Sequence, residues 1–208
     1  MKSDVLLAKK ILRAESLAIH SLLKRVNRDF ECALDLMEHA TGRIIVTGMG
    51  KPGFIGRKIA ATFASTGTPS LFLHPAEAIH GDIGMVTKQD VVIAISNSGE
   101  TEEITRLLST IKKIGSRLIA LTGNTKSTLA RHSDVVLHIG LEKEACPWNL
   151  APTASTTASL AMGDALAICL AKRKGFREED FAFLHPGGSL GKKLVKVRDL
   201  MRRGKQHP

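Results

Sequence analysis

Three hydroxyl side chains, those of Ser96, Ser98 and Thr101, lie within six residues where a strand is expected to pass into a helix. The preceding residues 91–95 are apolar and mostly β-branched, which is typical of a buried parallel strand. The residues that follow have apolar side chains at helical spacing. A helix start presents unpaired N–H groups and a positive dipole, so this segment, Asn97 included, predicts a phosphate-binding loop. Capping alone would need one hydroxyl rather than three.

A glycine-rich loop, residues 48–53, follows an earlier predicted strand and matches the pattern G-x-G-x-x-G. That pattern is found in dinucleotide-binding folds, where an acidic residue closes the second strand and binds the ribose. This chain has His74 and Pro75 at that point. Lys51 within the loop suits a compact anion better than a stacked dinucleotide. The spacing of a P-loop is also missing, so we expect no nucleotide cofactor.

Five titratable residues are expected to face the carboxyl ends of the strands: His80, Asp82, Glu103, Glu144 and His185. A single histidine in a loop is more often solvated or structural than catalytic, but both histidines here are followed by glycine-containing turns. His80 and Asp82 alone do not make a metal site, and we expect no metal.

A second hydroxyl cluster, residues 153–157, opens the longest helical pattern of the chain. Its side chains, including Ser155, are equally compatible with capping that helix and with binding a polar sugar.

The elements that must position these residues alternate between strands and helices. Predicted strands cover residues 43–47, 70–74, 91–95, 117–121 and 134–139, with helical patterns between them. Such alternation predicts an α/β fold, a five-stranded parallel sheet in an αβα sandwich whose ligands bind at the carboxyl ends of the strands. Two helices, at 3–26 and about 28–39, form an N-terminal hairpin that packs either on this domain or on a partner subunit.

Composition predicts one domain with an aliphatic core. The 208 residues are 43% hydrophobic and only 4% aromatic. No apolar run is long enough to span a membrane and the N-terminus lacks a signal-peptide pattern, so we expect no membrane association. Three widely spaced cysteines suggest a reducing, cytoplasmic location.

The formal charge of +10 is concentrated near the C-terminus, where residues 189–208 hold seven basic residues and one acidic residue. A solvated tail is the common meaning of such a run, and the absence of interleaved aromatic residues argues against a stacking platform for single-stranded nucleic acid. A nucleic-acid-binding protein remains as a rival interpretation, which predicts affinity that falls steeply with salt.

Several stretches resemble the arabinose-5-phosphate isomerases, a family built on the sugar-isomerase (SIS) domain with a flavodoxin-like fold. The resemblance runs from about residue 42 to 201 and is carried by residues 48–51, 56–69, 80–82, 96–104, 144–147, 150–153 and 185–188. It implies interconversion of D-ribulose 5-phosphate and D-arabinose 5-phosphate for Kdo synthesis, without a cofactor. It also implies a homotetramer with active sites at subunit boundaries, where His185 comes from a neighbouring chain.

The resemblance assigns functional roles to Lys51, His80, Glu103, Glu144 and His185. Glu144 is the expected base, with its pKa raised by burial, and Lys51 would offset enediolate charge. The expected substrate-binding residues are Ser96, Asn97, Ser98, Thr101, Gly50, Ser65, Thr66 and Ser155.

Two departures from the family pattern stand out. Pro52 replaces the serine of the family's G-K-S-G loop and removes a hydroxyl and an N–H group near the ligand. A junction that leads into paired CBS modules in many members is present at 197–201, and the sequence ends at Pro208. We therefore expect helices at 1–41, a SIS domain at 42–196 and a basic tail at 197–208. A phosphosugar-sensing SIS module without catalysis is the main alternative.

Overall fold

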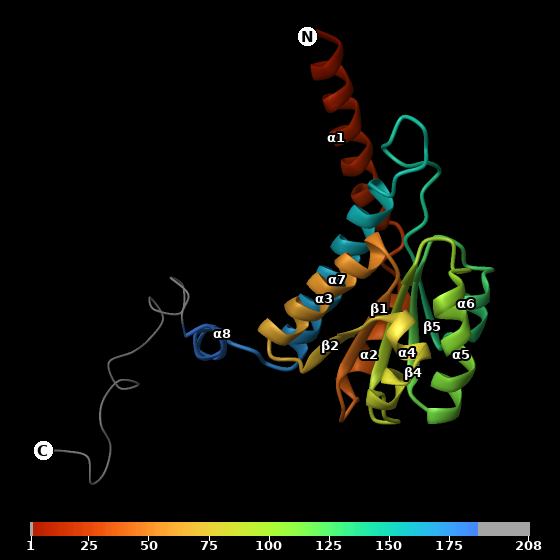
Figure 1. The fold of residues 1–208 in the computed structure, drawn as a ribbon. Coiled ribbons are helices and arrows are strands. Elements are labelled where there is room, and N and C mark those ends of the chain that lie inside the picture. Colours follow the sequence, from red (N-terminus) through yellow and green to blue (C-terminus); the bar gives the residue numbers. More distant parts are fainter. Residues whose placement is uncertain (1, 187–208) are drawn as a thin grey trace, which may run out of the picture.

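The central element is one sheet of five parallel strands in the order β2-β1-β3-β4-β5 (Figure 1). The structure is a computed structural model and describes residues 2–186. β1 and β3 are buried along their whole length, whereas the edge strands β2 and β5 are partly exposed. The predicted five-stranded parallel sheet is confirmed, with bounds β1 (Ile44–Gly48), β2 (Ser70–Leu73), β3 (Val91–Ser96), β4 (Arg117–Thr122) and β5 (Val135–His138).

The helices lie on both faces of this sheet, as predicted for βαβ units. The α-helices are α1 (Lys2–Leu22), α2 (Arg28–Glu38), α3 (Lys51–Ser65), α4 (Pro75–Ile79), α5 (Glu102–Ile114), α6 (Thr128–His132), α7 (Ala154–Arg173) and α8 (Glu178–Leu184). A 3-10 helix, η1 (Asp82–Met85), follows α4.

Alternate side chains of each strand enter two separate cores. Ile44 and Val46 of β1 pack with α2, α3 and α7, whereas Ile45 packs on the opposite face with α4, α5 and α6. This alternation is the two-residue period of a strand, and it buries both faces of the sheet. The phenylalanines are few, so aliphatic side chains fill most of both cores, as the composition predicts.

Helices α3 and α7 pack closely and run in the same direction, as their colours in Figure 1 show. The approach is close because Gly163 of α7 faces Ile59 of α3: a Cβ at Gly163 would collide with the Ile59 side chain. Lys58 donates to the Asp164 carboxylate at 2.6 Å beside this contact. The contact falls in the middle of both helices, so their N-terminal turns lie at the same end of the sheet.

The N-terminal hairpin packs on its own domain only in part. Ala18 and Leu22, near the end of α1, are buried in the core with α2 and α7. The first part of α1 extends beyond the body of the domain (Figure 1), and apolar side chains such as Leu12 remain exposed. Contacts within one chain therefore account for Ala18 and Leu22, whereas most other apolar side chains of α1 remain exposed.

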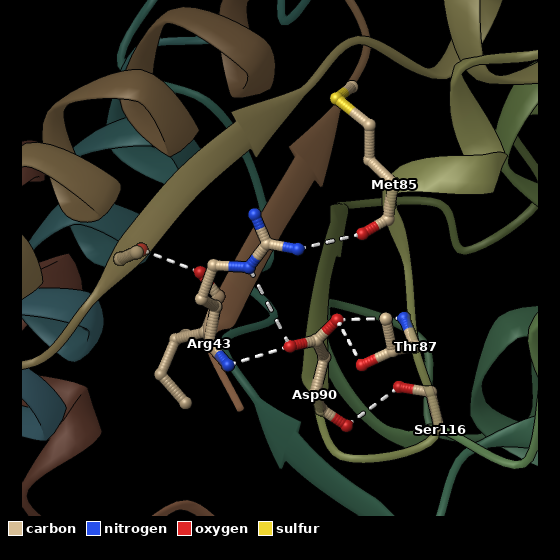
Figure 2. A network of polar contacts seen from close by, with 7 residues as sticks. Arg43, Met85, Thr87, Asp90 and Ser116 are labelled. Atoms are coloured by element: carbon tan, nitrogen blue, oxygen red, sulfur yellow. Dashed lines mark hydrogen bonds and ion pairs between the residues drawn. The ribbon is translucent and has the colours of Figure 1, made fainter. Parts of the chain in front are cut away.

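A buried carboxylate, that of Asp90, joins the strands at the amino-terminal edge of the sheet, where they begin (Figure 2). Asp90, whose side chain is 1% exposed, precedes β3 and accepts hydrogen bonds from the Arg43 N–H at 2.6 Å and the Thr87 N–H at 2.7 Å. The Thr87 hydroxyl adds a third bond at 3.0 Å, and Ser116 donates to the Asp90 carbonyl. This network joins the starts of β1, β3 and β4, so the polar groups of Asp90 at this edge serve to hold the strands together.

Contrary to the expectation that no apolar stretch is long enough to span a membrane, α7 is long and apolar enough to do so, and it is the one such helix in residues 2–186. Of its most apolar window, 56% is buried within the domain. It packs against α1, α2 and α3, which is the behaviour of the core helix of a folded domain.

Candidate active site

The candidate site lies at the carboxyl edge of the sheet, where β1 and β3 are neighbours. From β1 the chain goes to β2 on one side, whereas from β3 it goes to β4 on the other. Loops that leave adjacent parallel strands in opposite directions open a crevice between them, the usual ligand position in such sheets. Gly48 of β1 pairs with Ile95 of β3, so the loops after these strands, with Lys51 and Ser96, begin side by side.

The hydroxyl side chains of the β3–α5 loop are joined by hydrogen bonds at the start of α5. Ser96 is 2% exposed, and its Oγ accepts from the Gly99 N–H at 3.0 Å and lies 2.8 Å from the Thr101 Oγ1. Thr101 is the N-cap of α5 but makes no side-chain capping bond. Its hydroxyl is instead used to fix the loop, and the exposed Ser98 and Asn97 stand in front of the helix start. The predicted hydroxyl cluster is therefore assembled as one unit at a helix N-terminus.

Glycine is required at the centre of this loop. Gly99 has φ +68, and a Cβ there would collide with the Ser127 side chain. Ser127 caps α6, so the loop is pressed against the next helix start. Glu100 adds a second link, because its Oε1 accepts from the Thr128 N–H at 2.8 Å.

The β1–α3 loop supplies a positive charge beside the hydroxyl loop. Gly50 is the N-cap of α3, with φ +62, and Lys51 is the exposed first residue of that helix. Pro52 occupies the first turn, where a helix has no internal partner for the N–H that proline lacks. The proline is therefore compatible with this helix start and leaves the Lys51 side chain in place.

Glu144 lies at the N-terminus of α7. Its Oε2 accepts from the Thr153 N–H at 2.9 Å, the Ser155 N–H at 3.1 Å and the Thr153 hydroxyl at 3.3 Å. Partial burial acts to raise the pKa of the Glu144 carboxyl, but hydrogen bonds from Ser155 and Thr153 outweigh burial and lower the pKa below its ordinary value. The predicted upward shift of this pKa is therefore wrong in direction, because the carboxylate caps a helix.

The same end of the sheet collects four of the predicted groups. The first turns of α3 and α7, with Lys51 and Ser155, lie at one end because these helices run in the same direction. Glu103 is the half-buried second residue of α5, next to the hydroxyl loop. Glu144 joins them at the first turn of α7. A lysine, two carboxylates and the hydroxyl loop thus lie at the same, carboxyl end of the sheet.

His80 and Asp82 lie on the α4 side of the sheet. His80 ends α4, and Asp82 begins η1; both side chains are exposed. Across residues 2–186, no three or more His, Cys, Asp or Glu side chains gather closely enough to hold a metal ion. These two residues therefore have no third donor in the described chain.

Three predicted residues are not brought to this edge. Ser65 and Thr66 lie at the end of α3, which starts at the carboxyl edge and returns to the amino-terminal edge, and both hydroxyls donate to the Thr62 carbonyl. His185 follows α8, which lies away from the sheet (Figure 1). Its ring stacks on Phe181, with the ring centres 3.8 Å apart. Within one chain, His185 is therefore remote from Glu144.

Thr153 and Asn149 hold Glu144 through contacts that the sequence did not predict. Asn149 accepts from the Glu144 N–H at 2.7 Å through its side-chain oxygen and adopts φ +56. The sequence is compatible with capping or with sugar binding at residues 153–157, and neither role describes the contacts of Thr153 with Glu144. The sequence shows only that Thr153 is a polar residue at a helix start. That position does not reveal that its partner is Glu144, nine residues earlier.

The family model described as "SIS domain" matches residues 37–169. The chain is 55% identical over 202 residues to arabinose 5-phosphate isomerase KdsD of Pseudomonas aeruginosa, covering 97% of this chain and 62% of that protein. It thus spans about three fifths of the length of the curated relatives that it matches.

Two solved structures are also similar. The Escherichia coli CFT073 protein c3406, in complex with arabinose 5-phosphate, is 43% identical, with a TM-score of 0.86 over 89% of this chain and 98% of that one. A putative sugar-phosphate isomerase from Listeria monocytogenes is 31% identical, with a TM-score of 0.87 over 90% and 98% of the two chains. The αβα fold described above is shared with both.

Proposed function

The chain belongs to the SIS-domain family, and we propose that it is an aldose–ketose isomerase acting on a phosphorylated pentose. The observation that carries the proposal is the pairing of an anion-binding loop, residues 96–101, with an ionised carboxylate, Glu144, at one edge of the sheet. The names of the relatives support arabinose 5-phosphate as one member of the substrate pair, and the resemblance implies D-ribulose 5-phosphate as the other. The isomerase domain would comprise residues 42–196, and the proposed tail at 197–208 lies outside the described residues.

The phosphate would bind at the β3–α5 loop. The exposed Ser98 hydroxyl and the open N-terminus of α5 would supply a hydrogen-bond donor and a positive dipole for a dianion. Ser96 and Thr101 would hold the loop in shape and offer the hydroxyl hydrogen that their mutual bond leaves over, and Asn97 and Gly50 would border the same crevice. A charge-assisted hydrogen bond contributes about 1.5–3 kcal/mol. Binding energy at the phosphate would fix the reacting carbons without taking part in the chemistry.

The proton transfer would be made by a carboxylate, with Glu144 as our assignment and Glu103 as the next candidate. The base takes the proton from C1 of the ketose, the C1–C2 enediol forms as O2 gains a proton, and the proton returns to C2 as the O1 hydroxyl becomes the aldehyde. Glu144 is ionised at neutral pH, as a proton acceptor must be, and the hydrogen bonds that lower its pKa also make it a weaker base. Lys51 would offset negative charge on the enediolate.

The histidines would open the sugar ring or polarise its carbonyl. His80 is on the same chain, at the end of α4. His185 is remote from the site of its own chain, so we propose that it acts in the site of a neighbouring chain. The exposed apolar side chains of α1 support such an assembly, a homotetramer as the resemblance implies. Ser65 and Thr66, at the far edge, would contribute only through a neighbouring chain.

The cellular setting is proposed from composition and relatives. Cys32, Cys146 and Cys169 are all free, which fits a reducing, cytoplasmic compartment. The product would supply Kdo synthesis for lipopolysaccharide or capsule. Nucleic acid is not a proposed partner, and a gel-shift titration with salt would test the basic tail for one.

A phosphosugar-sensing module is the second candidate function, favoured by the engagement of Glu144 as a helix cap. A sensor needs the phosphate loop but no acid–base group. The test is turnover measured on a panel of pentose and hexose phosphates, with Glu144→Gln as the control. We expect turnover of ribulose 5-phosphate that falls about 10²–10⁴-fold in the variant. Tight binding of a phosphosugar without turnover would favour the sensor.

A further inference from the structure

The N-terminus of α7 is capped in an unusual way. Thr153 occupies the N-cap position, where a threonine normally accepts a hydrogen bond from the first turn of its own helix. Its side chain makes no such bond. The Glu144 carboxylate replaces it, accepting from the N–H groups of both Thr153 and Ser155. The Thr153 hydroxyl is thus free for a different contact.

That hydroxyl joins the two ends of the loop that carries Glu144. The Thr153 Oγ1 accepts from the Ala145 N–H at 3.0 Å and donates to the Glu144 Oε2 at 3.3 Å. The Asn149 side chain holds the Glu144 N–H from inside the same loop. The Glu144 carboxylate and the Ala145 N–H are therefore tied to the start of α7, and the Glu144 N–H is tied to Asn149 within the loop.

We propose that Thr153 is a positioning residue, whose hydroxyl holds the Glu144 carboxylate at the start of α7 in the orientation used for proton transfer. That this orientation serves proton transfer rests on the proposed function above. That Thr153 holds the Glu144 carboxylate rests only on the contacts of Thr153. Thr153 does not need to touch the substrate, because it acts through Glu144.

The charged side chains on the segments near Glu144 either bond to other groups or are exposed to solvent. Arg25, between α1 and α2, donates to the Gly140 carbonyl, and Glu15 of α1 accepts from Thr157 at 3.0 Å. Glu142 and Lys143 of the same loop are exposed. The first turn of α7 has no acidic residue. The causes of the lowered pKa of Glu144 are hydrogen bonds from Ser155 and Thr153 acting against burial, with no contribution from these charges.

The first test follows the titration of Glu144 itself, by carbon NMR of the labelled side-chain carboxyl. Thr153→Val keeps the shape of the side chain and removes the hydroxyl, so the titration midpoint of Glu144 should rise. Thr153→Ser should leave it unchanged. Thr157→Val is the matched control, because it removes a threonine–carboxylate bond one turn further along the same helix. An unchanged midpoint in Thr153→Val, or an equal change in Thr157→Val, would overturn the proposal.

The second test is kinetic. Thr153→Val should lower kcat about tenfold, as expected for one hydrogen bond to a charged group, with KM nearly unchanged. The acidic limb of the pH profile should move upward with the NMR midpoint, and Thr153→Ser should restore both. A loss of activity with an unmoved pH profile and a lower melting temperature would mean a structural role only. If Thr153→Val shifts the titration midpoint of Glu144 but the parent protein has no isomerase activity, the contact between Thr153 and Glu144 stands and the proposed function fails.

Discussion

At the scale of single residues, the carboxylate of Glu144 connects stability with pH. Its pKa is lowered on folding, so its contribution to stability is present above the ordinary glutamate value of about 4.3 and is lost as the pH falls through the lower folded pKa. Glu144→Gln should therefore lower the melting temperature at pH 7, and the difference from the parent protein should narrow below about pH 4. A difference that stays constant across this range would contradict the capping role.

Ser98 tests the phosphate loop. Its side chain is exposed; its hydroxyl accepts from the Glu100 N–H at 3.2 Å and lies 3.5 Å from the Ser96 Oγ. Ser98→Ala should raise KM by about tenfold or more, equivalent to about 1.5–3 kcal/mol, and change kcat little. Ser109→Ala, on the exposed side of α5, is the control. A fall in kcat at constant KM would place Ser98 in the chemical step instead.

The residue types predicted part of the site and not its finer contacts. The clustering of Ser96, Ser98 and Thr101 at a helix start could be predicted from their spacing after a strand, whereas phosphate binding by them stays a prediction. The contacts of Glu144 could not, since they depend on a loop closed by Asn149 at positive φ. Burial alone predicts a raised pKa for Glu144, whereas the direction of the shift depends on those contacts.

At the scale of elements, the β3–α5 loop, the proposed phosphate site, is held by its contacts with the start of α6. Gly99→Ala would place a Cβ against Ser127 in a backbone conformation that alanine rarely adopts. We expect a loss of about 1–3 kcal/mol in the free energy of unfolding and weaker phosphosugar binding, measured by urea denaturation and calorimetry. Gly84→Ala is the control, because no atom lies within 4 Å of its Cβ position. Equal effects of both substitutions would contradict this role of the contacts with α6.

The five strands were predicted from the sequence, whereas the one-turn helices were not. Strand bounds agree to within one or two residues because each strand is a continuous apolar run. The one-turn elements α4, η1 and α6 were not predicted, since five residues or fewer show no helical periodicity. Helix α1 ends at Leu22 rather than near residue 26, and Arg25 beyond it binds the Gly140 carbonyl, a contact that a local pattern cannot reveal.

At the scale of the whole molecule, α8 lies away from the domain and α1 leaves apolar side chains exposed (Figure 1). Both features favour an assembly in which His185 completes a site on a neighbouring chain. Inactive Glu144→Gln protein mixed with inactive His185→Ala protein should then regain part of the activity, because some mixed sites contain both residues. The control is each variant mixed with itself. No recovery after verified subunit exchange would mean that each site is built from one chain.

The proposed reaction moves a proton between C1 and C2 of a phosphorylated pentose. The most direct measurement is proton NMR of ribulose 5-phosphate incubated with the protein in deuterated water. We predict that arabinose 5-phosphate forms with deuterium at C2 and that the ketose gradually gains deuterium at C1. Saturable binding of ribulose 5-phosphate, with no deuterium entering C1 or C2, would contradict the proposed isomerisation.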